Sequence, residues 1–276
     1  MSALSVPQPR NRSWFKGSNV LTALQHAYIW IWLILFILPF LTTVLRSLES
    51  PDGGYSLEGY RFAFGSFQDS LLLSVRVTVI TIVLNLLIAV PAAFAIVRYP
   101  VPGKRFILSA LSVSLYTPGA VMGLSLSITY AYLLNIQGSV TGLVAAYTVG
   151  TFPLMLVPVI VALRDLPEVY AEAARTLGSG RMRTLLRIEL PLLGPGISAG
   201  ILLTFVIVFN EFLVTLFIAG KSNTTAALVI YNLLGRAGFA PSTAALAAIM
   251  QFTSFIVVLA FFKFFGSRYL KGTYLG

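Results

Sequence analysis

Long apolar stretches separated by short polar ones make up most of the sequence. A helix that crosses the roughly 30 Å hydrocarbon core of a bilayer needs about 20 apolar residues. Stretches of about that length cover residues 27–45, 71–97, 107–134, 141–163, 197–218 and 244–264. The pattern therefore predicts an all-α membrane protein with six transmembrane helices in one domain, residues 27–265, between tails at residues 1–26 and 266–276.

Prolines and glycines interrupt some of these stretches. The third contains Tyr116-Thr117-Pro118-Gly119 near its middle, and such a break is tolerated where the backbone is buried in protein or lines a cavity. The fifth is predicted to be one continuous span that holds Asn210 and Glu211. Residues 46–69 are predicted to form a polar loop, and residues 219–242 a mixed loop or re-entrant segment.

The composition supports a membrane protein and excludes several functions. Of the 276 residues, 57% are hydrophobic and 10% are charged, which is too apolar for an ordinary soluble domain. The absence of cysteine and the presence of a single histidine exclude thiolate and zinc chemistry. The net charge of +10 comes mainly from the tails and from residues 98–105 and 164–187, so it indicates membrane topology and not nucleic-acid binding. By the positive-inside rule, these segments and both termini are expected in the cytoplasm.

One polar stretch, residues 164–197, separates the fourth and fifth apolar stretches. Its first part is predicted to be a short amphipathic helix that ends at Gly178-Ser179-Gly180, because glycine readily adopts the left-handed conformation. A basic helix over residues 181–188 follows, and Pro191 and Pro195 are expected to stop it before the next span. Apolar residues recur at helical spacing in the first helix and are predicted to form one stripe: Leu166, Tyr170, Ala173, Ala174 and Leu177.

The same stretch resembles the EAA motif of ABC importer permeases. Glu172-Ala173-Ala174, Gly178 and Ile188-Glu189-Leu190-Pro191 match every fixed position of that motif, with its spacing, between two predicted spans. In that family the motif is a coupling-helix pair, which docks into a groove of a cytoplasmic ATPase. The implied pair covers residues 164–191, which we call the charged segment. The resemblance implies coupling roles for Leu166, Tyr170, Glu172, Ala173, Ala174, Arg175, Leu177, Gly178, Arg181, Leu190 and Pro191.

The resemblance also implies a fold, a location and partners. It extends over about residues 65–265 and implies the type I importer permease fold, in the bacterial inner membrane. The implied partners are a cytoplasmic ABC ATPase dimer, a second permease subunit expected to be a different chain, an external solute-binding protein and membrane lipid. The sequence has no G-x-x-x-x-G-K-[ST] string and no catalytic constellation. We therefore expect no cofactor and no enzymatic activity in this chain, with ATP and magnesium bound by the partner ATPase.

Within that family, the sequence is most similar to the second permease of polyamine (spermidine/putrescine) systems. The similarity rests on an acidic position in the fifth span and on Arg98-Tyr99-Pro100, Gly103-Lys104-Arg105-Phe106, Ile230-Tyr231, Gly238, Pro241 and Ala245. Asn210-Glu211 stands where a pair of aspartates is expected. A small organic cation is therefore the favoured solute, although opine, aminoethylphosphonate, ferric-ion and thiamine systems use similar permeases.

Candidates for the translocation path lie inside the predicted spans: Arg76, Pro118, Asn210 and Glu211. A carboxylate such as Glu211 is costly in a bilayer, so it either faces the path, where it would favour cations, or pairs with Arg76 or a backbone donor. Arg76 lies on the outer side of the second span, where it either extends to the lipid head groups or joins the path.

Two other classes of function fit a polytopic membrane protein. An ion-coupled secondary transporter would need ionisable residues near the middle of the membrane and usually an inverted repeat, and the sequence shows no repeat. A membrane-embedded enzyme would need a cluster of catalytic residues, and none is found. Uptake that depends on a proton gradient, and not on ATP, would favour the ion-coupled transporter.

Overall fold

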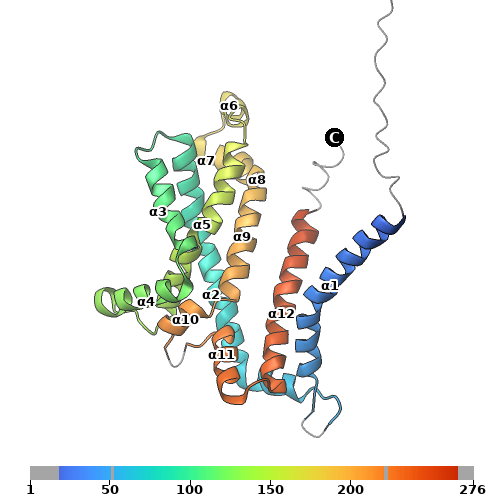
Figure 1. Ribbon diagram of the computed structural model, residues 1–276. Coiled ribbons are helices and arrows are strands. Elements are labelled where there is room, and N and C mark those ends of the chain that lie inside the picture. The colour runs from blue at the N-terminus through green and yellow to red at the C-terminus, as the bar shows by residue number, and fades with distance from the viewer. Residues whose placement is uncertain (1–18, 51–52, 221–222, 267–276) are drawn as a thin grey trace, which may run out of the picture.

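The protein is a bundle of helices in the computed structural model, which describes residues 19–50, 53–220 and 223–266 (Figure 1). Residues 1–18 and 267–276 of the predicted tails lie outside this part. Four helices are long and apolar enough to cross a membrane: α1 (Asn19–Ser47), α2 (Glu58–Arg98), α5 (Val140–Arg164) and α12 (Pro241–Phe261). The described residues form no strand beyond one isolated bridge between Glu49 and Tyr55, so the predicted all-α class is confirmed.

The centre of the bundle is formed by α2, α5 and α9 (Gly194–Phe209), which pack against one another. Their buried contact surface includes Ala89, Val159 and Leu193, none of which is accessible to solvent. Within it, the amide of Asn85 donates a hydrogen bond to the hydroxyl of Thr151 at 2.8 Å. Apolar packing with an occasional hydrogen bond between polar side chains is typical of helices that associate within a membrane.

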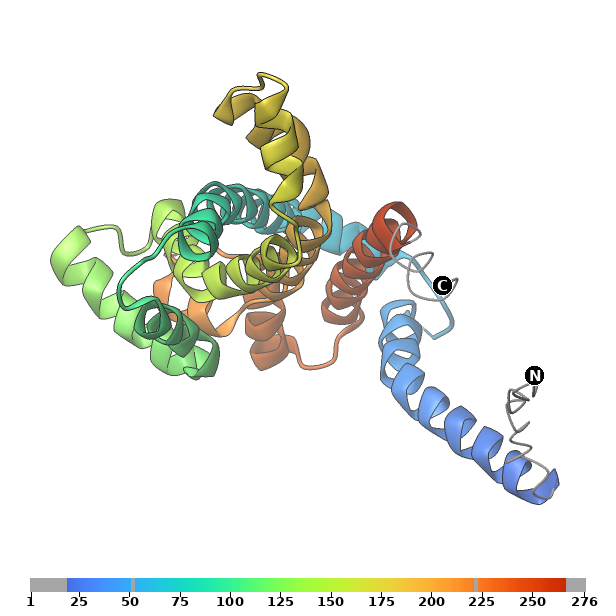
Figure 2. The same ribbon diagram turned by 90° about the horizontal axis from the view of Figure 1, so that it is seen from above.

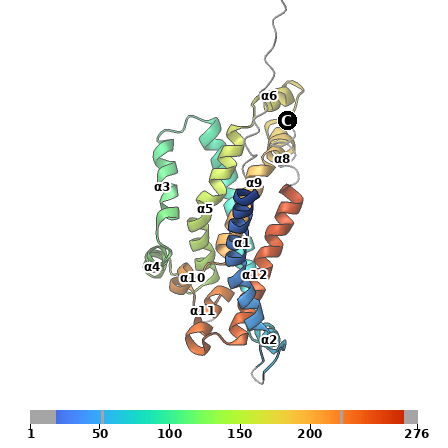
Figure 3. The ribbon, with the colours of Figure 1, turned by 45° about the vertical axis from the view of Figure 1, so that its right-hand side comes forward.

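The third apolar stretch forms two helices and not one straight span. Helix α3 (Lys104–Tyr116) ends before Pro118, and α4 (Gly119–Thr129) continues into the π-helix η1 (Tyr130–Leu134). The two parts meet at an angle of 109°, so that α4 projects sideways from the bundle (Figure 1) and is seen almost end-on in Figure 3. The predicted break at Pro118 is confirmed, because this proline precedes α4 in an extended conformation.

The prediction of a continuous fifth span is wrong. Helix α9 ends at Phe209, and a separate short helix, α10 (Leu213–Ile218), follows after Asn210-Glu211-Phe212. The break is stabilised locally, because a carboxylate oxygen of Glu211 accepts a hydrogen bond from the backbone N–H of Val214 at 3.0 Å. This bond satisfies a donor that the start of α10 would otherwise leave free. Helix α10 then packs against α4, so the two broken stretches meet.

The polar connections are more helical than expected. Helix α2 begins at Glu58, inside the predicted loop of residues 46–69, and residues 219–242 include the short helix α11 (Ala226–Ala237). Helix α11 starts where the hydroxyl of Ser74 on α2 accepts a hydrogen bond from the backbone N–H of Ala226 at 2.9 Å. A tertiary contact therefore fixes the start of α11, which the local sequence does not reveal.

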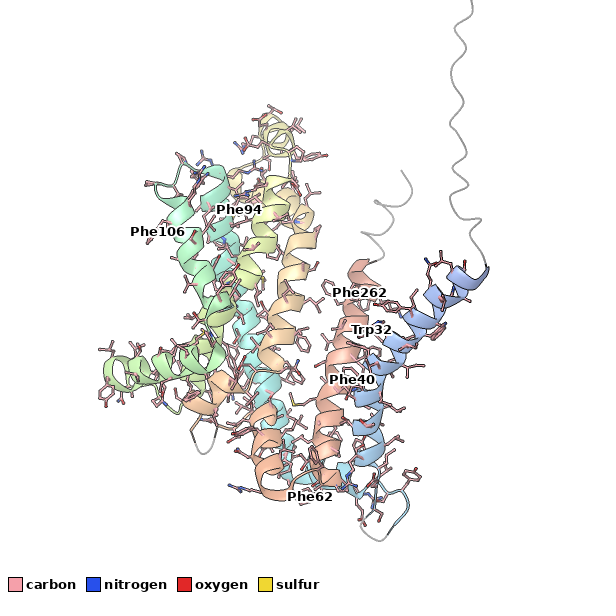
Figure 4. The ribbon with its side chains drawn as sticks, in the orientation of Figure 1. Trp32, Phe40, Phe62, Phe94, Phe106 and Phe262 are labelled. Carbon is pink, nitrogen blue, oxygen red and sulfur yellow. The ribbon has the colours of Figure 1, made fainter. Side chains whose placement is uncertain are left out.

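Helix α1 stands apart from the central bundle and packs against α12 (Figures 1 and 2). It begins at Asn19, earlier than the predicted residue 27, and its aromatic side chains, including Trp32 and Phe40, are exposed (Figure 4). An apolar surface all round a helix suits a lipid environment. The first residues of α1 and the last residues of α12 lie on the side of the molecule that carries α6 (Val169–Thr176) (Figure 1).

Candidate functional site

The charged segment projects from one end of the bundle as a bent helical pair (Figure 1). After α6, the turn passes through Gly178, whose φ of 83° lies in the left-handed region and confirms the predicted helix end. The second helix is continuous over Arg181–Leu192 and comprises α7 (Arg181–Thr184), the π-helix η2 (Leu185–Glu189) and α8 (Leu190–Leu192).

The second helix ends at Leu192, between Pro191 and Pro195, in agreement with the predicted stop. It meets α9 at an angle of 66°, and the change of direction falls between Leu192 and Gly194. The π-helical turn η2 ends two residues before Pro191, and such widened turns are a common way for a helix to accommodate a disrupted hydrogen-bond ladder. Leu190 is half-buried in this part of the segment, whereas Pro191 is exposed.

The predicted single apolar stripe is divided between two faces. Ala174 is buried and Leu166 packs against the core of the bundle, whereas Tyr170, Ala173 and Leu177 are exposed. Within α6, Ala171 and Ala174 lie three residues apart on the buried face, whereas Tyr170, Ala173 and Leu177 lie on the exposed face. Leu166 precedes α6, which begins only at Val169.

The charged segment exposes large apolar side chains together with arginines. Leu177 at the tip is 89% exposed, and the exposed apolar side chains around it are Val169, Tyr170, Met182 and Leu186. Arg175 and Arg181 are also exposed. Glu172 makes no ion pair with Arg175, since the ion pairs among the described residues are Arg46–Glu49 and Arg98–Glu168. A group of exposed apolar residues flanked by charges is typical of a protein-binding surface.

A cavity of about 550 Å³ lies between the end of α2 and the charged segment. Its walls include Phe94 of α2, Ala171 of α6 and Leu185 of η2. Charged side chains of both signs line it: Arg98, Glu168, Glu172, Arg175, Arg181 and Glu189. The charged segment is therefore not closely packed against the last turns of α2.

A second cavity, of about 260 Å³, lies where the two broken stretches meet. Glu211 lines it, together with Thr117 and Gly119, which flank Pro118, and with Tyr147 and Thr151 of α5. Pro118 and Glu211 were separate candidates from the sequence, and the structure places Glu211 and the break at Pro118 at one site. Tyr147 and Thr151 were not among the candidates, although hydroxyl groups in an otherwise apolar stretch are a signal that could have indicated them. A carboxylate with hydroxyl groups around it can bind a cation or a hydrogen-bond donor.

The other two candidates for the path lie elsewhere. Asn210 points away from Glu211, because its amide donates to the carbonyl oxygen of Val206 at 2.8 Å and lies 3.5 Å from the hydroxyl of Ser254 on α12. Arg76 is exposed, does not line the cavity and makes no ion pair with Glu211. The described part of the chain contains no group of three or more metal-ligating side chains.

Comparisons with known proteins agree on one family. The family of binding-protein-dependent transport system inner membrane components matches residues 85–271. Over 242 residues the chain is 30% identical to the spermidine/putrescine transport system permease protein PotC of Escherichia coli (strain K12). The matched region covers 85% of this chain and 88% of PotC. It is 32% identical over 155 residues to the molybdenum transport system permease protein ModB of the same strain, covering 52% of this chain and 68% of ModB.

A solved structure shows the same fold. It is the crystal structure of a bacterial ABC transporter involved in the import of the acidic polysaccharide alginate. The two chains superpose with a TM-score of 0.69 at 16% sequence identity, over 90% of this chain and 99% of the other.

Proposed function

Since the chain belongs to the family of binding-protein-dependent transport system inner membrane components and is an ABC importer permease subunit, we propose that its charged segment docks on a partner ATPase. The observation that carries this proposal is the exposure of Leu177, Tyr170 and Ala173 on a helical pair that projects beyond the bundle. Exposed apolar side chains on a short helix suit an apolar groove on a partner.

The proposed partners are an ATPase dimer, a second permease chain and an external binding protein. The chain has no P-loop, so the ATPase dimer supplies the sites for ATP and magnesium. The charged segment and both termini lie in the cytoplasm, as the positions of lysine and arginine favour. A second permease chain completes the pore, and an external binding protein delivers the solute. An ion-coupled carrier is not supported, because the chain belongs to an ABC importer family.

The cavity at the broken stretches forms part of the translocation path in this proposal, and its solute is a small organic cation such as a polyamine. Two observations support this: Glu211 is the carboxylate in the cavity, and PotC is a spermidine/putrescine permease. Relatives include ModB, for molybdenum, and the trehalose permease SugB of Mycobacterium tuberculosis, so the relatives alone do not select a solute. The charge of the cavity favours the cation.

The docking surface is tested by Leu177→Asp. Because Leu177 is 89% exposed, the change should leave the fold intact. In a docked complex it places a charge in an apolar contact, which at a central interface position costs about 2 kcal/mol or more. The expected result is a roughly 30-fold weaker association with the ATPase. The measurement is the amount of ATPase that co-purifies with the tagged permease after gentle solubilisation, together with solute uptake.

The matched control is Tyr55→Asp, which introduces the same charge at a side chain that is 78% exposed near the other end of the bundle. This variant is expected to retain the ATPase. Equal recovery of the ATPase with Leu177→Asp and with the wild type would refute the docking surface. A wild-type chain that purifies without any ATPase would refute the proposed assembly.

A further inference from the structure

Arg98 differs from the other basic residues of the structure. It is the last residue of α2, and its side chain is only 16% exposed. Every other lysine and arginine within residues 19–50, 53–220 and 223–266 is exposed. A guanidinium group that is largely withdrawn from water needs fixed partners, because an unpaired buried charge is costly.

The partners of Arg98 both belong to the charged segment. One terminal nitrogen of its guanidinium group forms an ion pair with the carboxylate of Glu168, and the second terminal nitrogen donates to the backbone carbonyl oxygen of Leu166 at 3.3 Å. The planar, forked guanidinium group is suited to binding two acceptors at once. The positive charge also lies at the C-terminus of α2, where the helix dipole favours a cation.

This contact spans a region where apolar packing is incomplete. The cavity of about 550 Å³ separates Val90 and Phe94 of α2 from Ala171 of α6 and Leu185 of η2. Arg98 and Glu168 are themselves part of its lining. The Arg98–Glu168 pair therefore connects α2 and the charged segment across a cavity. Because the two are not closely packed there, the charged segment has room to move relative to α2.

The N-terminal half of α2 contacts helices α11 and α12. The hydroxyl of Ser74 accepts the hydrogen bond from Ala226 that starts α11. Nearer its N-terminus, Gly59 lies so close to the start of α12 that a Cβ atom there would be 2.9 Å from the carbonyl oxygen of Pro241. Between these contacts and Arg98, α2 is one unbroken helix.

We propose that Arg98 is a positioning residue that ties the charged segment to α2. A displacement of the segment is thereby passed along α2 to α11 and to the start of α12. The proposal rests on the proposed function, in which the ATPase moves the charged segment. The first part of the proposal, that the Arg98–Glu168 ion pair (the tie) positions the charged segment, concerns the permease chain alone. It can therefore be tested in the purified chain without an ATPase.

The first experiment measures the position of the charged segment in the purified chain. The sequence has no cysteine, so spin labels can be placed at Leu177→Cys on the segment and Leu87→Cys on α2, two positions with 89% and 65% exposure. The expected distance distribution is narrow in the otherwise unchanged chain and broad with Arg98→Glu. The exchanged pair, Arg98→Glu with Glu168→Arg, is expected to restore the narrow distribution. A distribution that Arg98→Glu leaves unchanged would overturn the tie, whether or not an ATPase binds.

The second experiment measures coupling in the reconstituted importer. With Arg98→Glu, the ATPase is expected to co-purify as with the wild type, while uptake per ATP hydrolysed falls roughly tenfold, the size of a typical coupling between sites. The exchanged pair is expected to recover uptake, which a merely destabilised fold would not do. The matched control is Arg105→Glu, with unchanged uptake expected: Arg105 is an exposed arginine at the start of α3 and makes no ion pair with any residue that the structure describes.

The outcomes separate this proposal from the proposed function. Loss of the ATPase from the wild-type complex would refute the proposed function, and with it the transmission along α2, while the distance measurement would still decide the tie. Normal uptake per ATP with Arg98→Glu, in complexes that contain the ATPase, would overturn the transmission alone.

Discussion

Replacement of Gly196 by alanine is expected to destabilise the bundle by about 3 kcal/mol, at the upper end of the usual cost of overpacking. A Cβ atom at this position would lie 2.5 Å from the carbonyl oxygen of Pro158 and 2.6 Å from Cβ of Ala162. Both belong to α5, and neither a backbone carbonyl nor an alanine can turn away. The helices α5 and α9 would have to separate, which would weaken the buried contact at the centre of the bundle.

The measurement is thermal unfolding of the purified chain in detergent, with an expected fall in the midpoint of roughly 5–10 °C. Gly65→Ala is the matched control, because Gly65 lies inside α2 and a Cβ atom there would meet nothing within 4 Å. Alanine should raise stability at that position by about 0.5–1 kcal/mol, since glycine inside a helix is unfavourable. Equal midpoints for Gly196→Ala and the wild type would show that α5 and α9 are not in the close contact described.

Replacement of Glu211 by glutamine is expected to reduce cation uptake at least roughly tenfold, since a charge-assisted bond contributes about 1.5–3 kcal/mol and each 1.4 kcal/mol is a factor of ten. Glutamine keeps a side-chain oxygen that can accept the hydrogen bond from the N–H of Val214, so the start of α10 is preserved. The change therefore removes the negative charge from the cavity and little else. Uptake of radiolabelled polyamines into proteoliposomes measures the effect.

Glu58→Gln makes the same chemical change at an exposed position in the first turn of α2 and is expected to leave uptake unchanged. A neutral solute that still enters through the Glu211→Gln variant would indicate that the pore itself remains open. If the Glu211→Gln variant transports every cation tested with wild-type kinetics, Glu211 has no role in the path.

Much of the architecture could be predicted from apolar periodicity and from proline. The break at Pro118 was predictable because proline lacks an N–H donor. The turn at Gly178 was predictable because glycine readily adopts the left-handed conformation, and its φ of 83° lies in that region. The break at Asn210-Glu211-Phe212 was not predicted. No proline or glycine marks it, and a nonlocal contact between α10 and α4 accompanies it.

The candidate sites divide in the same way. The EAA pattern identified the charged segment, because its residues are contiguous and their spacing can be read directly. The division of its apolar residues between two faces could not be read from spacing, since it depends on which face of α6 packs against the rest of the protein. Likewise, nothing in the sequence pairs Arg98 with Glu168, which are far apart along the chain.

The sequence by itself determined the class, the approximate spans, the family motif and the charged segment, because these depend on local composition and short-range spacing. The tertiary structure alone decided that Glu211 and the break at Pro118 share one cavity and that Arg76 lies outside it. It also decided that Arg98 pairs with Glu168 and contacts Leu166 of the charged segment. The physical reason is that cavities and ion pairs form between side chains from different helices, and helix packing sets their separation.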